Sequence, residues 1–150
     1  MSSPIFLDTG LLIAHCSNNK TEANRVLEAE KIFQKNPHSS RHTVEPCLVE
    51  LFYKVRKHTQ ISPKDVKTHL NHWAVTPFPV DASKILEKYL LISHKAQFDF
   101  ADFYLCCAAL HVSRSIILTI DRNDFPLALS YAQKSKLFPE SNVVQLIPLM

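Results

Sequence analysis

The feature of this 150-residue sequence that most restricts its fold is the alternation of short apolar runs with longer amphipathic segments. Residues 4–8 and 116–120 are short and rich in branched or aromatic side chains, which predicts buried strands. Residues 41–44 and 143–147 are two further candidate strands. Residues 75–80 contain two prolines, so they can form only an edge strand.

Helical periodicity and helix-start signals fill the intervals between these runs. Ser62-Pro63, for example, is typical of an N-cap followed by proline at the first helical position. The predicted helices cover residues 11–16, 21–35, 46–58, 63–73, 81–94 and 98–111, and a short helix follows residue 124. Strands that alternate with helices over this length predict one domain, residues 1–150, with an α/β fold and a central, mainly parallel sheet flanked by helices.

Composition narrows the class of protein. Hydrophobic residues make up 46% of the chain, which is typical of a globular protein. The longest apolar runs, residues 105–112 and 116–120, are far shorter than the roughly 20 residues that span a membrane. The N-terminus lacks the basic and long apolar regions of a signal peptide, and the four cysteines form no Cys-x-x-Cys motif. We therefore expect a cytoplasmic protein without a membrane segment.

The aspartates are concentrated in two places. Asp8 is the last residue of the first predicted strand, and Asp99, Asp102, Asp121 and Asp124 lie within 26 residues of one another, although the net charge of the chain is +3. In open parallel sheets, ligands bind beyond the carboxyl ends of the strands. The pattern predicts an anionic pocket for a divalent cation on a surface that suits phosphate.

Each acid also has a purely structural interpretation. Asp8 could cap the helix that follows it, and Asp121 could be a turn residue. Glu50 lies within a run that we expect to be buried, where a carboxylate needs a partner or a metal, and Lys54 stands one helical turn further on.

The acids of the second group have similar alternatives. No basic residue follows Asp102 at three or four positions. Asp99 could be the N-cap of this helix with Asp102 three positions later, and Asp124 could cap the short helix after it.

Taken together, the acids favour a single chemistry. The ends of two strands and the first turns of two helices could bring Asp8, Glu50, Asp102 and Asp121 together. Clustered carboxylates raise one another's pKa values, and Mg²⁺ or Mn²⁺ relieves that repulsion. Two such ions can activate water and stabilise the leaving oxygen when a phosphodiester is hydrolysed.

Four motifs carry a resemblance to a known family over nearly the whole chain. They are IFLDT at residues 5–9, LVELFY at 48–53, DFYLCCAAL at 102–110 and LTIDRNDF at 118–125. In this order and spacing they resemble the PIN-domain nucleases, especially the VapC-like toxins of toxin–antitoxin systems. The resemblance implies a PIN-like three-layer fold and an endoribonuclease that depends on Mg²⁺ or Mn²⁺. It also implies a homodimer and, for the toxins, an antitoxin protein that inserts into the active-site groove.

The resemblance assigns a role to each motif residue. Asp8, Glu50, Asp102 and Asp121 would be catalytic metal ligands, Asp124 an outer or alternate ligand, and Thr9 and Thr119 would orient water or phosphate. Two basic residues, Arg122 within the last motif and Lys54 directly after the second, are candidate contacts to the RNA substrate. Glu45 stands where the family often has a small polar residue, so its role and that of Asp99 stay open.

Two other functions remain as alternatives. An α/β phosphatase would use Asp8 as a nucleophile, but the partner acid normally found two residues on is replaced by Gly10. A catalytically silent RNA- or partner-binding module would keep the fold without the metal chemistry.

Overall fold

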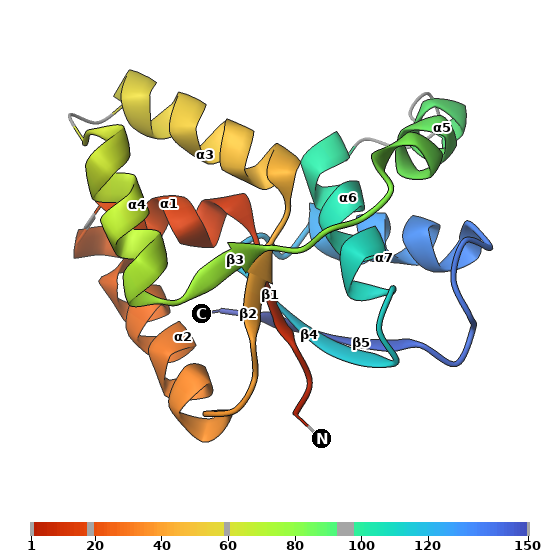
Figure 1. Ribbon diagram of the computed structural model, residues 1–150, viewed down its shortest axis with the longest axis horizontal. Helices are drawn as coiled ribbons and strands as arrows, with labels where there is room; N and C mark the ends of the chain where they lie inside the picture. The colour runs from red at the N-terminus through yellow and green to blue at the C-terminus, as the bar shows by residue number, and fades with distance from the viewer. Residues whose placement is uncertain (1, 18–19, 59–60, 93–97, 150) are drawn as a thin grey trace.

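The computed structural model describes residues 2–17, 20–58, 61–92 and 98–149. Its strands form one all-parallel sheet in the order β3-β2-β1-β4-β5 (Figure 1). The strands are β1 (Ile5–Leu7), β2 (Arg41–Thr43), β3 (Val75–Pro77), β4 (Arg114–Thr119) and β5 (Val143–Pro148). As predicted, the proline-containing strand β3 is at an edge of the sheet.

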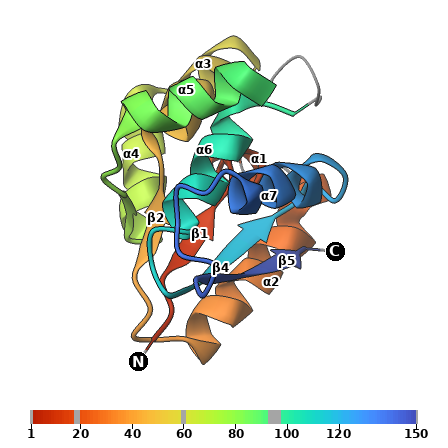
Figure 2. The same cartoon turned by 90° about the vertical axis from the view of Figure 1, so that its right-hand side faces the viewer.

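Helices cover both faces of this sheet (Figures 1 and 2). They are α1 (Thr9–Ser17), the short 3₁₀ helix η1 (Lys20–Glu22), α2 (Ala23–Lys35), α3 (Glu45–His58), α4 (Pro63–His72), α5 (Ala82–Ile92), α6 (Phe100–Ala109) and α7 (Asp124–Lys134). The predicted α/β fold is therefore confirmed, with the three layers expected of a PIN-like arrangement.

Alternation along the strands creates a separate hydrophobic core on each face of the sheet. On β1, Ile5 and Leu7 pack with α1, α2 and α4, whereas Phe6 packs on the opposite face with α6 and α7. Helix α3 contributes to both cores, because Leu51 belongs to the core that contains Ile5 and Leu7, and Cys47 belongs to the core that contains Phe6. This position brings α3 close to the carboxyl ends of the central strands.

The start of α4 confirms a sequence signal in detail, whereas the end of α5 lies at the limit of the described residues. At the start of α4, the Ser62 hydroxyl accepts a hydrogen bond from the Asp65 N–H at 3.2 Å, and the Asp65 carboxylate accepts one from the Ser62 N–H at 3.3 Å. This capping box confirms the predicted N-cap. The helix predicted at residues 81–94 is described as far as Ile92, and residues 93–94 lie outside the described part.

Helix α7 is longer than the short helix predicted after residue 124. It has 11 residues, because Phe125, Ala128, Leu129 and Ala132 recur at helical spacing and are buried against α6. Within the described ranges, no helix has the length and apolar character needed to cross a membrane.

The register of the sheet determines which residues meet at its functional edge. Ile5 pairs with Ile116 and Leu7 with Leu118 on the adjacent parallel strand. Asp8, the residue after β1, is therefore level with Thr119 at the end of β4.

Candidate functional site

Asp8 is almost completely buried at the junction of β1 and α1, with 3% of its surface exposed. Its Oδ1 accepts a hydrogen bond from the Leu11 N–H at 2.7 Å, so it also caps α1, as the structural alternative anticipated. Its Oδ2 accepts hydrogen bonds from the Thr119 hydroxyl and from the Ile120 N–H at 3.3 Å. The carboxylate is thus held in one orientation at the ends of the two neighbouring strands β1 and β4.

Burial raises the pKa of Asp8 from 3.8 to about 6. The hydrogen bonds from Thr119, Leu11 and Ile120 oppose this rise, and the negative charge of Asp121 adds to it. Asp8 is therefore largely ionised at neutral pH, although it binds a proton more tightly in the folded protein than an aspartate does in water.

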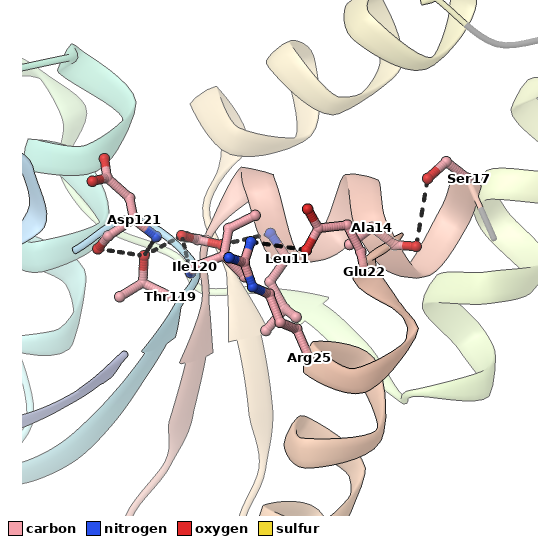
Figure 3. Close-up of polar contacts among 9 residues, drawn as sticks. Leu11, Ala14, Ser17, Glu22, Arg25, Thr119, Ile120 and Asp121 are labelled. Atoms are coloured by element: carbon pink, nitrogen blue, oxygen red, sulfur yellow. Dashed lines mark hydrogen bonds and ion pairs between the residues drawn. The ribbon is translucent and has the colours of Figure 1, made fainter. Parts of the chain in front are cut away.

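The turn after β4 is organised around Thr119 and Asp121. The Asp121 N–H donates to the Thr119 Oγ1 at 2.9 Å, and the Asp121 Oδ1 accepts from the Asn123 and Asp124 N–H groups at 2.9 and 3.1 Å. The Asp121 carboxylate points away from Thr119 (Figure 3). Asp121 is therefore both the predicted turn residue and an acid next to Asp8.

Asp102 lies in the first turn of α6 and is half-buried. Burial, followed by the negative charges of four other acids, raises its pKa from 3.8 to about 8. Those acids are, in order of effect, Asp99, Asp8, Asp121 and Glu50. Among the described residues, no hydrogen-bond donor or basic side chain contacts the Asp102 carboxylate. We call these five residues, Asp8, Glu50, Asp99, Asp102 and Asp121, the acid cluster.

Glu50 requires a correction. The sequence predicted a buried environment for it, but its side chain is 27% exposed and its neighbours Val49 and Tyr53 are 67% and 62% exposed. Its Oε1 forms an ion pair with the Lys54 Nζ at 2.9 Å, which is the structural alternative proposed from the spacing. Glu50 nevertheless lies near enough to Asp102 to raise the pKa of that residue.

The structure also decides the position of the acids whose role was open. Asp99 is the N-cap residue of α6 by its backbone conformation, but its side chain makes no capping hydrogen bond, and it is the acid that most strongly affects Asp102. The signal for this role was the three-residue spacing, which puts both side chains on one face of the helix.

Glu45 is exposed and lies beside Tyr104 in an apolar groove between α3, α5 and α6. Asp124 is exposed at the first position of α7, and it is not among the main causes of the raised pKa of Asp8 or of Asp102.

The hydroxyl groups predicted to orient water or phosphate have different environments. The Thr119 hydroxyl donates to Asp8. The Thr9 Oγ1 is buried without a hydrogen-bond partner among the described residues, although it lies near enough to the Cys47 thiol to lower the pKa of that group. The pKa of Cys47 is raised to about 12, chiefly by burial and to a smaller extent by the charges of Asp8 and Asp102. Thr9 therefore has a hydroxyl oxygen without a hydrogen bond close to the acid cluster.

The two predicted substrate contacts are each adjacent to an acid of the cluster. Lys54 is 46% exposed on α3 and paired with Glu50, and Arg122 is exposed immediately after Asp121.

The carboxylate oxygens of the acid cluster are ligands of the type that a hard divalent cation prefers. Carboxylate oxygens are the preferred ligands of Mg²⁺ and Mn²⁺, and an acid with a strongly raised pKa gains most from a neighbouring cation. In the described part of the chain, however, no three histidine, cysteine, aspartate or glutamate side chains are arranged to hold a metal ion. Closing around a cation would therefore require the side chains of the cluster to move.

Comparisons of this chain with models of protein families, with curated proteins and with solved structures found no match.

Proposed function

We propose that this chain is an endoribonuclease of the PIN-like type that depends on Mg²⁺ or Mn²⁺. The observation that carries the proposal is Asp102, an acid among four other acids. Among the described residues its carboxylate has no hydrogen bond and no ion pair, and its pKa is raised to about 8. Such a carboxyl group is poorly ionised at neutral pH, and a divalent cation would restore its charge. A structural role alone gives no reason to gather these carboxylates.

The residues of the chain have separate tasks in this proposal. Asp8, Asp102 and Asp121 would hold the cation, with Glu50 and Asp124 as further oxygen donors. When bound, the cation supplies charge neutralisation at the scissile phosphate and activation of the attacking water. Thr119 fixes the orientation of Asp8 by donating to its Oδ2, and Thr9 offers a buried hydroxyl beside the cluster.

RNA is the substrate class that the charge distribution favours. The chain has a net charge of +3 although the acids are concentrated at the functional edge. Arg122 is exposed directly beside Asp121 and is suited to contact a phosphate of the RNA backbone.

The rival enzymatic function is less well supported. A phosphatase nucleophile needs a carboxylate oxygen that can attack phosphorus, but both oxygens of Asp8 already accept hydrogen bonds. Gly10 provides no partner acid. A silent binding module remains the other alternative, and the metal requirement separates it from the nuclease.

The expectations about partners and location belong to the same proposal. Exposed apolar side chains on α3 and α5, among them Val49, Tyr53, Leu86 and Leu91, support contact with a protein, either a second copy of the chain in a homodimer or an antitoxin. The four cysteines are buried free thiols, which agrees with a reducing, cytoplasmic location.

The test is cleavage of structured RNA by the purified chain with Mn²⁺, with Mg²⁺ and with chelator. We expect cleavage with either ion and none with chelator, and we expect Asp102→Asn to lose at least about 100-fold in rate, the loss of roughly 3 kcal/mol of transition-state stabilisation. Glu87→Gln is a matched control, because it removes one exposed carboxylate from α5, outside the cluster, and should cleave like wild type. Chelator-resistant cleavage, or an active Asp102→Asn protein, would contradict the proposal.

A further inference from the structure

Lys54 is a basic residue in direct contact with the acid cluster. Its Nζ lies 2.9 Å from the Glu50 Oε1 and within electrostatic range of Asp99 and Asp102. It therefore faces the cluster from α3, while Asp99 and Asp102 face it from the first turn of α6.

The ion pair between Lys54 and Glu50 is easily broken. The Lys54 and Glu50 side chains are 46% and 27% exposed, and ion pairs as exposed as this one contribute little to stability. The lysine ammonium is a point charge on a flexible stem, so it can leave one carboxylate without any change in the backbone.

A second observation concerns a buried hydroxyl group near this region. The buried Thr9 hydroxyl has no hydrogen-bond partner among the described residues. It lies beside the Cys47 thiol, whose pKa is raised in part by the charges of Asp8 and Asp102. A buried hydroxyl without a partner is unfavourable unless something else supplies its hydrogen bond.

We propose that Lys54 is a displaceable counter-ion, which neutralises Glu50 while the site has no divalent cation and competes with that cation for the acid cluster. Lys54 is then a positioning residue that sets the affinity of the site for the metal. This inference rests on the proposed function, since it requires that the acid cluster binds a divalent cation.

The measurement is Mn²⁺ affinity, obtained from the loss of the electron paramagnetic resonance signal of free Mn²⁺ as protein is added. Replacing Lys54 with methionine keeps most of the side chain and removes the charge. We expect Lys54→Met to bind Mn²⁺ about 3- to 5-fold more tightly than wild type, because up to about 1 kcal/mol no longer opposes the ion and 1.4 kcal/mol is a factor of ten.

Two further variants separate competition for Glu50 from a general effect of charge. Lys57→Met removes the same charge one turn along α3, where the Lys57 Nζ lies near the Tyr53 hydroxyl, and should leave the affinity unchanged. In a Glu50→Gln background, Lys54→Met should have a smaller effect, since the carboxylate for which the two cations compete is gone.

The possible results are distinguishable. Equal affinities of wild type, Lys54→Met and Lys57→Met would overturn this inference and leave the proposed function intact. Mn²⁺ binding by Lys54→Met but not by wild type would support the inference. Absence of Mn²⁺ binding in every variant would overturn both the inference and the proposed function.

Discussion

Replacing Asp102 with asparagine should make the protein more stable when divalent cations are removed by a chelator. The substitution keeps the shape of the side chain and removes an acid that four neighbouring carboxylates disfavour in its ionised form. An acid site that evolved for a ligand is expected to be strained without it, so this variant should gain stability while it loses activity.

The size and pH dependence of the gain follow from the pKa of Asp102. In the folded state the pKa of about 8 lies above the ordinary aspartate pKa of 3.8. The folded state therefore binds the proton more tightly, and wild type loses stability as the pH rises between these two values. At about 1.4 kcal/mol for each pH unit, the upper limit at pH 7 is about 4 kcal/mol. Because Asp102 is only half-buried, screening by water reduces this, and we expect about 2 kcal/mol.

The assay is urea unfolding of wild type and Asp102→Asn in chelator at pH 5, 6, 7 and 8. The variant should be more stable at pH 7, equivalent to a rise of roughly 4–8 °C in Tm, and its advantage should increase from pH 5 to pH 8. Glu87→Gln should track wild type at every pH. The reasoning is refuted by an Asp102→Asn protein that is less stable than wild type at pH 7, or by a difference that does not grow with pH.

Three other substitutions test separate parts of the structure. Thr119→Val removes the hydroxyl that donates to Asp8, so the Asp8 pKa should rise above about 6 and urea unfolding should show a loss of roughly 1–2 kcal/mol; unchanged stability would contradict this. Gly10→Ala places a Cβ 2.9 Å from the Ile120 Cγ1, which should offset the gain of about 1 kcal/mol in helix propensity, whereas in an Ile120→Ala background the same change should stabilise. Burial lowers the pKa of His15 to about 4, so wild type should lose up to about 3 kcal/mol as the pH falls from 6.5 to 4, and His15→Phe should flatten that slope.

The fold could be predicted from the sequence because its strands and helices carry strong local signals. The β-branched run of residues 116–120 predicted a central strand, and β4 lies between β1 and β5 as that pattern requires. The proximity of Asp8 and Asp121 was predictable for the same reason, since both follow neighbouring parallel strands.

The environment of the α3 acid could not be predicted. Apolar residues flank Glu50 on both sides, but Val49 and Tyr53 are exposed, because no other described element covers that face of the helix. A sequence pattern indicates which face of a helix is apolar, and it does not indicate whether the fold supplies a partner for that face. The effect of Asp99 on Asp102 did have a signal, the three-residue spacing at the start of α6, although the sequence left the role of Asp99 open.

The central claim is that the acid cluster is destabilised by its own charge and is relieved by a divalent cation. The most direct measurement is the Tm of wild type and of Asp102→Asn at pH 7.5 as Mn²⁺ is added from zero to millimolar concentration. We predict a saturable rise for wild type, about 2.7 kcal/mol of stabilisation at 100 times the Kd, and little or no rise for Asp102→Asn. Equal rises in the two proteins, or none in wild type, would contradict the account.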